Sequence, residues 1–359
     1  METVKLGLLI KKTKVARCGE HSYPVLSITK QDGIIMQSEK FKKRIASADT
    51  SDYKIIPRGK LVQGIHIDEG NFGIQDIVDN GIVSPAYGVW DVNDGLVIPK
   101  YLEMVLRSPK SIEFYRSKLT GTVNRRGHMS DADFLSMDIP LPDRDTQSKI
   151  LKTMKQTTSV LYSRQQQLAK LDELIKARFV EMFGDPYTNS KDYPLKKGES
   201  FFKLSNGKAV PESKRLNGGI PAYGGNGISW YTDESLFDAD TIVVGRVGFQ
   251  SGNVHLVKGP LWVTDNAMYM SSCDFSQYNL TFLIELMAHV DFTKFQDAGD
   301  LKKITQKPFM QFEYLCPPLS LQNQFAAFVA EVDKSKVEVQ KALDQTQLLF
   351  DSLMQQYFG

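Results

Sequence analysis

The chain has 359 residues, an apolar content of 42% and a formal net charge of +2. This length suits two domains of roughly 100–200 residues each, and the composition is that of a folded globular protein. Lysine plus arginine (44) barely exceed aspartate plus glutamate (42), and neither globular part is strongly basic, so charge alone neither requires nor excludes a nucleic-acid partner.

The cysteines and the amino-terminal residues indicate the compartment in which the protein is expected to function. Cys18, Cys273 and Cys316 are odd in number and far apart, which excludes a disulfide framework and a Cys-x-x-Cys metal pair. The first residues, METVKLGLLIKKTK, hold only a short apolar run, and no later stretch approaches the roughly 18 apolar residues of a membrane span. We therefore expect a reducing, cytoplasmic location and no membrane partner.

Residues 1–142 are predicted to form a β-rich domain. Short β-branched runs broken by glycine, as in LVQGIHIDEGNFGIQDIVDNGIVSPAYGVW (61–90), are typical of hairpins. The domain ends at IPLPDRDTQ, where Pro140 and Pro142 force extended backbone before a helix. Asp145 is the predicted helix cap.

Residues 143–184 are predicted to form a long spacer helix. Mostly apolar residues recur there with alternating spacings of four and three, and Arg164 and Arg178 take the two remaining positions. We call these positions the seam of the helix; they are Ile150, Met154, Thr157, Leu161, Arg164, Leu168, Leu171, Ile175, Arg178 and Met182. A heptad pattern sustained for about five repeats makes a narrow stripe, which requires a partner stripe. Gly184 is predicted to end the helix in the left-handed conformation.

Residues 185–318 are predicted to form a second β-rich domain, and residues 319–359 a second spacer helix. DPYTNSKDYP (185–194) is the junction between the halves, and CPPLSLQ precedes the second helix, with Ser320 as its predicted cap. The segment IVVGRVGFQSGNVHLVKGPLWVTDNAMYM (242–270) aligns with 61–90, and places Gly64 on Gly245. The β-rich domains therefore repeat, although faintly.

The helical regions repeat more clearly, because residues 129–184 align with 304–359 without a gap. Gln147 falls on Gln322, and both copies end on Phe-Gly. The second seam comprises Phe325, Val329, Val332, Lys336, Val339, Leu343, Thr346, Phe350, Leu353 and Tyr357. Two tandem units can pack about a pseudo-two-fold axis, which would make the two long helices antiparallel. The alternative is that the two helices are core helices of one ordinary domain.

The ordered set of motifs resembles the specificity subunits of Type I restriction–modification enzymes over essentially the whole chain. The set comprises the IPLPDRDTQ and PPLSLQ helix starts, the EMFGDPYTN junction, IPAYGGNGI (220–228) and the VVGRVGFQSGNV and WVTDNAMYM segments. The first half departs from the pattern, with SYPVLSIT (22–29) where the second has IPAYGGNGI. The resemblance implies an α+β fold, in which two β-rich target-recognition domains are separated by two long helices that form an antiparallel coiled coil.

The same resemblance implies a division of labour among subunits. Each β-rich domain is expected to contact one half of a split site in double-stranded DNA. The helices are expected to set the spacer and to dock two modification subunits, which bind S-adenosylmethionine and methylate adenine N6, and motor-nuclease restriction subunits join them. This chain is then expected to supply recognition, with no cofactor and no catalytic site of its own.

Cations and amides on glycine-bounded loops are the candidate DNA contacts. Arginine can fork onto guanine or hold a phosphate, lysine does either less directionally, and asparagine can pair with adenine. The candidates are Lys12, Lys14, Arg17, Arg125, Arg126, Asn226, Arg246, Lys302 and Lys303. The alternative interpretation is a set of solvated loops, with Asn226 an ordinary turn residue.

Sequence motifs for catalysis or metal binding are absent. The five histidines lack ligand spacing, and neither a P-loop nor a Gly-x-Gly-x-x-Gly at a strand-to-helix junction occurs. Asp185-Pro186-Tyr187 lacks the second proline of the adenine-methyltransferase motif. Two other functions remain open. One is the recognition part of a fused methyltransferase or nuclease, and the other is a coiled-coil scaffold that binds protein or sugar.

Overall fold

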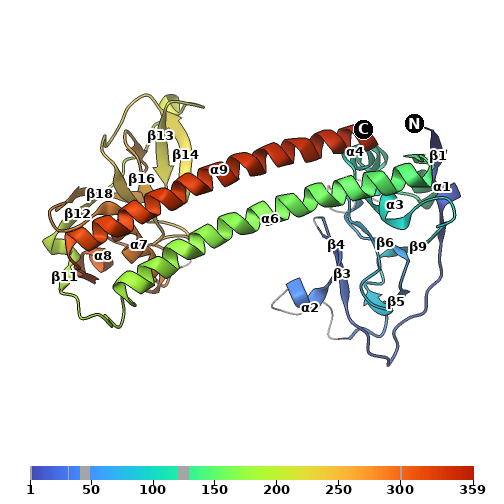
Figure 1. The fold of residues 1–359 in the computed structure, drawn as a ribbon, viewed down its shortest axis with the longest axis horizontal. Helices are drawn as coiled ribbons and strands as arrows, with labels where there is room; N and C mark the ends of the chain where they lie inside the picture. Colours follow the sequence, from blue (N-terminus) through green and yellow to red (C-terminus); the bar gives the residue numbers. More distant parts are fainter. Residues whose placement is uncertain (1, 31, 41–48, 120–128, 300) are drawn as a thin grey trace. The chain divides into compact units, whose positions relative to one another are not determined.

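The computed structural model describes residues 2–30, 32–40, 49–119, 129–299 and 301–359. They form two compact units, one of residues 1–164 with 342–359 and the other of residues 165–341. Each unit combines small β-sheets with helices, and each contains part of both long helices (Figure 1). The sequence-based domain boundaries, which divide the chain at helix ends, stay a prediction beside this division.

The first unit contains most of the elements of the first half of the chain. In chain order they are β1 (Thr3–Lys5), α1 (Leu6–Leu9), β2 (Ile10–Lys12), β3 (Leu26–Thr29), β4 (Gly33–Met36), α2 (Gln37–Lys40), β5 (Lys54–Pro57), β6 (Leu61–Gln63), β7 (Phe72–Ile74), β8 (Asn80–Val83), β9 (Gly88–Val92), α3 (Pro99–Leu106), α4 (Pro109–Lys118), α5 (Asp131–Leu135), β10 (Asp138–Pro140) and the start of α6 (Arg144–Phe183).

The second unit contains the end of α6 and the following elements. They are β11 (Leu195–Lys197), β12 (Phe202–Asn206), β13 (Ile220–Gly224), β14 (Gly227–Thr232), β15 (Thr241–Gly245), β16 (Val254–Val257), β17 (Trp262–Val263), β18 (Ala267–Cys273), α7 (Leu280–His289), α8 (Lys307–Gln311), β19 (Glu313–Leu315) and the start of α9 (Leu319–Phe358).

The central sheets of the two units share one strand order. The first is β2-β9-β6-β7 and the second β12-β18-β15-β16, with antiparallel neighbours throughout. Val62 pairs with Val89 in the first, and Val243 pairs with Tyr269 in the second. These registers match β6 with β15 at an offset of 181 residues and β9 with β18 at an offset of 180, so the faint repeat is a structural one with a one-residue shift before its last strand.

A second hairpin accompanies each central sheet. It is β3-β4 in the first unit and β13-β14 in the second. Ala222 in β13 pairs in parallel with Trp262, and Val25 beside β3 forms a parallel bridge to Ile82. The segments SYPVLSIT and IPAYGGNGI therefore occupy the same topological position despite their different sequences.

The predicted antiparallel pairing of the long helices is confirmed within each unit. In the first, Ile150 and Met154 near the start of α6 share a core with Phe358 at the end of α9. In the second, Phe179 near the end of α6 contacts Phe325 near the start of α9, with ring centroids 5.6 Å apart. A stretch of α6 (green in Figure 1) thus lies beside a stretch of α9 (red) in both units.

The heptad seam is also confirmed. Every predicted seam position on both helices is buried or partly buried, whereas off-seam Leu174 and Leu349 are exposed. The lysine in the second seam, Lys336, forms an ion pair of 2.6 Å with Asp172 of α6. A polar group at a seam position favours one register of the two helices over its alternatives.

The predicted helix caps are wrong, although the predicted stop is correct. Asp143, the residue before α6, accepts a hydrogen bond of 2.9 Å from the Thr146 amide, and this contact lowers the pKa of Asp143. Asp145 lies inside the first turn, two positions after the capping residue. Ser320 likewise lies inside α9, which begins at Leu319. Gly184 follows α6 with a φ of +74°, as expected of a left-handed stop.

A buried glutamine joins the first turn of each long helix to its own unit. The Oε1 atom of Gln147 accepts from the amide of Ile98 at 2.8 Å, and that of Gln322 accepts from the amide of Asn279 at 2.9 Å. Each Nε2 donates to the carbonyl of the proline five residues earlier, at 2.8 Å in both units. Both side chains are fully buried, so the P-x-x-x-x-Q spacing that the two helix starts share encodes one structural device.

Candidate nucleic-acid interface

In the second unit, four of the predicted contact residues lie on adjoining turns at one end of the central sheet. Asn226 lies in the turn between β13 and β14, and Arg246 directly follows β15. Val247 forms a bridge with Lys303, and the amide of Gly248 donates to the carbonyl of Lys302 at 2.8 Å. The fold therefore brings Asn226, Arg246, Lys302 and Lys303 together from segments far apart in the sequence.

A contact between two glycines allows these turns to adjoin. A Cβ atom at Gly245 would lie 2.6 Å from the carbonyl oxygen of Gly225, and one at Gly225 would lie 3.3 Å from the Cα of Gly245. Any side chain at Gly245 would therefore push the β13-β14 turn away. The glycines of YGGNG and VVGR are explained by this close approach.

Hydrogen bonds on both sides hold the backbone of Arg246. Its amide donates to the carbonyl of Asn266 at 2.9 Å, and its carbonyl accepts from the amide of Ile304 at 3.0 Å. The guanidinium has one long hydrogen bond, 3.4 Å from Nη1 to the carbonyl of Asp265. A rigid backbone with a side chain so weakly engaged suits recognition of an external partner.

A shallow groove of about 450 Å³ lies beside Arg246. Its lining combines amides, a second cation and one thioether, namely Asn206, Thr305, Gln306, Lys307 and Met310 with Arg246. Gln306 donates from Nε2 to Oδ1 of Asn206 at 3.2 Å, so the strand end of β12 and the segment before α8 meet here. Arginine, asparagine and glutamine are the side chains that form bidentate contacts with guanine and adenine.

We call the residues Asn206, Asn226, Arg246, Lys302, Lys303, Gln306 and Lys307 the strand-end cluster. No carboxylate of the described residues lies within ion-pairing distance of its four cations. Lys303 and Lys307 are exposed, and Lys302 and Arg246 are partly buried. The cluster is therefore a positively charged surface that also carries three amides.

The sequence did not single out Asn206, Gln306 and Lys307, although a signal for two of them was available. Gln306 and Lys307 follow Lys303 within KKITQK, the segment that carries the lysine pair. Asn206 belongs to SNGK, and only the pairing of β12 with β18 brings it to this end of the sheet. Its role depends on sheet topology, which no local pattern encodes.

Of the predicted DNA contacts in the first unit, Lys12 and Arg17 already have acidic partners, whereas Lys14 is exposed. Lys12 forms an ion pair with Asp131 and lies over the Trp90 ring, 5.6 Å from its centroid. Arg17 forms an ion pair of 2.5 Å with Asp52. The register of β2 with β9 places exposed Lys14 close to Gly88, a position matching that of Asn206 in the second unit. Of these three residues, Lys14 matches the strand-end cluster best.

A further cation of the first unit, Lys54, was missed. Its Nζ donates to the carbonyl of Tyr87 at 2.5 Å, and residue Arg17 forms a bridge with it. Burial lowers the pKa of Lys54, and the positive charges of Lys12 and Arg17 lower it further. Lys54 thus lies within electrostatic range of both predicted cations, Lys12 and Arg17. Arg125 and Arg126 lie outside the described residues.

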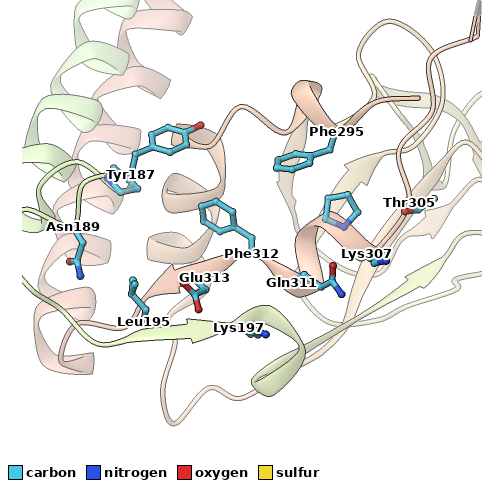
Figure 2. A pocket seen from close by; sticks show the side chains of 12 residues that line it. Tyr187, Asn189, Leu195, Lys197, Phe295, Thr305, Lys307, Gln311, Phe312 and Glu313 are labelled. Atoms are coloured by element: carbon cyan, nitrogen blue, oxygen red, sulfur yellow. The ribbon is translucent and has the colours of Figure 1, made fainter. Parts of the chain in front are cut away.

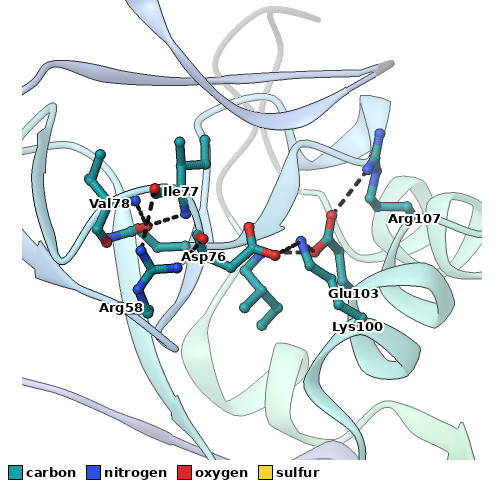
Figure 3. Close-up of polar contacts among 9 residues, drawn as sticks. Arg58, Asp76, Ile77, Val78, Lys100, Glu103 and Arg107 are labelled. Carbon is teal, nitrogen blue, oxygen red and sulfur yellow. Dashed lines mark hydrogen bonds and ion pairs between the residues drawn. The ribbon is translucent and has the colours of Figure 1, made fainter.

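An acidic side chain positions the β3-β4 turn of the first unit, and Figure 3 shows its contacts with Lys100 and Arg107. Buried Glu103 of α3 accepts from the amide of Ile74 at 2.9 Å and from Nη1 of Arg107 at 3.2 Å. Arg107 in turn donates from Nη2 to the carbonyl of Lys30 at 2.6 Å. Lys100 bridges Glu103 and Asp76, at 3.0 Å from each. This network does in the first unit what the glycine contact does in the second.

The larger hollow in the second unit has a different character (Figure 2). It measures about 680 Å³ and lies beside the junction and α8, with the rings of Tyr187, Phe295 and Phe312 around it. Its polar lining residues are Asn189, Lys197, Thr305, Lys307, Gln311 and Glu313. An apolar hollow of this kind offers little that discriminates between bases.

The described residues contain neither a metal-binding group nor a membrane-spanning helix. Among them, no three histidine, cysteine, aspartate or glutamate side chains form a group that could hold a metal ion. No helix in the same part of the chain is both long and apolar enough to cross a membrane.

Comparisons with known proteins identify a domain. Residues 191–346 match the family described as Type I restriction modification DNA specificity domain. A putative type I restriction enzyme specificity subunit of Haemophilus influenzae is 23% identical over 120 residues, which are 33% of this chain and 31% of that protein. The type I restriction enzyme EcoprrI specificity subunit of Escherichia coli is 23% identical over 113 residues, 32% of this chain and 28% of that protein. The matched segments thus span about a third of these relatives.

Two solved structures share the fold along the whole chain. The S subunit of a Type I restriction-modification system from M. genitalium has a TM-score of 0.62 at 15% identity, and the match covers 100% of this chain and 96% of that one. A structure reported for complex assembly and conformational transition of the type I R-M system has a TM-score of 0.61 at 15% identity, with 99% and 97% covered. The sequence-based expectation of this fold is therefore confirmed.

Proposed function

We propose that this chain is a specificity subunit of a Type I restriction–modification system and that it recognises a bipartite site in duplex DNA, supported by the matching domain and the shared fold. Each unit reads one half of the site through the turns at the end of its central sheet. The chain itself performs no chemistry. It directs adenine-N6 methylation and restriction by partner subunits.

The strand-end cluster is the observation that carries this proposal. Its amides and guanidinium offer the donor and acceptor pairs that distinguish adenine and guanine in the major groove. Its lysines suit phosphate contacts, which position a protein on the duplex without reading sequence. Both kinds of group lie on rigidly held turns around one shallow groove, as recognition of a regular polymer requires.

The partners follow from the same proposed identity as a specificity subunit. Two modification subunits bind S-adenosylmethionine and dock against the long helices, and motor-nuclease restriction subunits complete the complex. S-adenosylmethionine is held by the modification subunit, so the present chain contributes no cofactor ligand. Support comes from α6 and α9, each of which extends along 40 residues, about 60 Å at 1.5 Å per residue.

DNA binding by the full chain is tested with a labelled random duplex, by fluorescence anisotropy at two or more salt concentrations. We expect binding that weakens steeply with salt, because phosphate contacts release counterions. Replacing both Lys302 and Lys303 by alanine should lower the slope of log K against log salt by about 0.9 for each lost phosphate contact.

Lys258→Ala is the matched control, since Lys258 is exposed and follows β16 at the far end of the β15-β16 hairpin. It should leave the slope unchanged. Absence of any salt-dependent duplex binding would favour the scaffold alternative. Methyl transfer by the purified chain with S-adenosylmethionine and DNA would favour the fused-enzyme alternative.

The role of the helices is tested by lengthening both. Inserting seven residues after Gln165 and seven after Gln340 preserves the heptad pattern and adds about 10 Å to each helix, close to three base-pair steps. We expect the methylated sites of the assembled complex to keep both half-sites and to gain about three base pairs of spacer. Five-residue insertions are the control, because they rotate the seam away from its partner. An unchanged spacer in a folded seven-residue variant contradicts the ruler role.

A further inference from the structure

Phe249 has a side chain that folding does not use. It lies in the loop of residues 246–253 between β15 and β16, and it is 92% exposed. Phenylalanine is among the residue types most often buried, because its ring gains from leaving water. No other large apolar side chain of the described residues is as exposed as this one.

The backbone around Phe249 is held in place. The Gly248 amide donates to the carbonyl of Lys302 at 2.8 Å, and the Gly252 amide donates to the carbonyl of Gly245 at 2.8 Å. From the other side, Gln296 donates from Nε2 to the carbonyl of Ser251 at 2.7 Å. The ring is therefore presented by a braced loop, and binding it to a partner costs little additional ordering of the backbone.

The groups beside this loop define the chemistry of its partner. Arg246 begins the loop, Lys302 is hydrogen-bonded to its backbone, and Asn226 lies in the adjoining turn. These cations and amides suit base edges and phosphates of the major groove, where the one apolar group that a base presents is the C5-methyl of thymine. When these polar side chains contact base edges and phosphates, the Phe249 ring beside them lies within the same groove, where the thymine methyl is the group that it can pack against.

We propose that Phe249 packs against the C5-methyl of a thymine in the half-site that the second unit reads, and thereby specifies thymine there. The inference rests on the proposed function, because it requires the strand-end cluster to face duplex DNA. It adds an apolar specificity determinant to a site otherwise built from hydrogen-bonding groups.

The test uses the full chain and a pool of duplexes with a randomised central segment, made once with thymine and once with deoxyuridine in its place. Uracil pairs as thymine does and lacks only the methyl group. Sequences bound by the wild type are selected from the thymine pool, and a labelled consensus duplex is then prepared in both forms. Affinities are measured for the wild type, Phe249→Ala and Phe275→Ala.

Phe275 is the matched control, since it is 59% exposed and follows the opposite end of β18. We expect a thymine in one half of the consensus. Deoxyuridine should weaken wild-type binding about fourfold, the effect of losing one buried methyl contact. Phe249→Ala should weaken binding of the thymine duplex at least as much, while binding the two duplexes equally. Phe275→Ala should behave as the wild type does.

Two results overturn the inference while leaving DNA recognition intact. One is a consensus whose thymines can all be replaced by deoxyuridine without loss. The other is that Phe249→Ala lowers the affinity for both duplexes by the same factor relative to the wild type, which indicates that the ring contacts something other than the methyl group. Failure of the wild type to enrich any sequence overturns the proposed function itself, and this inference with it.

Discussion

The β3-β4 turn of the first unit and the β13-β14 turn of the second occupy the same place in the fold and are held there by different physics. In the first, the Glu103 carboxylate and the Arg107 guanidinium hold the backbone of Lys30. In the second, the backbones of Gly225 and Gly245 meet directly. The central sheets of the two units share one strand order, so the sheet framework is repeated whereas the turns differ. This is expected when rigid elements position variable recognition loops.

The charged groups at these turns differ as well. Arg246 directly follows Gly245, and the residue in the same position of the first unit is Ile65, which is 55% exposed. Lys12 and Arg17 of the first unit have acidic partners, whereas the cations of the strand-end cluster have none among the described residues. One frame thus presents two chemically distinct surfaces, as two different half-sites require.

The largest expected effect tests the repeated frame. Gln322→Leu leaves the Asn279 amide and the carbonyls of Gln277 and Pro317 without their buried partner. Gln147→Leu does the same to the equivalent groups of the first unit. Each change should destabilise the protein by about 2–3 kcal/mol in urea unfolding, because buried unpaired polar groups are costly. Gln324→Leu, at an exposed position of α9, should change stability by less than about 0.5 kcal/mol. Unequal losses for Gln147 and Gln322 contradict a shared device.

The next effect concerns a diverged turn of the second unit. Arg246→Ala should cost about 1–3 kcal/mol of discrimination at one base pair, because a fork onto guanine is lost. The methylated-site consensus of the assembled complex measures this change. The other half-site serves as an internal control and should stay as it is. Relaxed specificity in both halves shows that the two units do not read separately.

A test of the first unit replaces Arg125 and Arg126 by alanine. We expect the half-site left intact by Arg246→Ala to be the one affected. If both arginines hold phosphates, the salt slope of binding should fall by about one for each. Unchanged affinity and specificity would identify the segment as a solvated loop.

The smallest effect separates two lysines that the sequence treats alike. Lys14→Ala should lower the salt slope by about one, because exposed Lys14 has a position like that of Asn206. Lys12→Ala should lower it less, because Asp131 already compensates its charge. Equal slopes for the two variants indicate that the ion pair opens when DNA binds.

The sequence predicted the features that depend on periodicity and on repetition. The heptad positions, the antiparallel helices and the stop at Gly184 follow from local spacing, and each is present. Helices α3 and α4 were not predicted, although Pro99 and Pro109 at their first positions are a recognised start signal. Asp143 and Asp145 are both suitable cap residues by type, and only the hydrogen bond from the Thr146 amide identifies Asp143 as the cap.

The strand-end cluster could be predicted only in part. Arg246, Lys302 and Lys303 stand beside glycines or on loops that hairpin patterns reveal. Their proximity depends on the bridge between Val247 and Lys303 and on the pairing of β12 with β18, which are contacts between distant segments. Asn206 therefore became visible as a member only once the sheet was assembled.

The division of α9 between the units has a consequence for how the protein is made. Phe358 packs in the core of the first unit, 5.8 Å from the ring of Tyr101, and Lys110 donates to the carbonyl of Gly359. The first unit therefore holds contacts of very high sequence separation, whereas residues 165–341 of the second are contiguous. On the ribosome, the contiguous unit can close as soon as its residues emerge, while the first keeps an open core until residues 342–359 are made. The unit that is synthesised first is thereby the one that completes its core last.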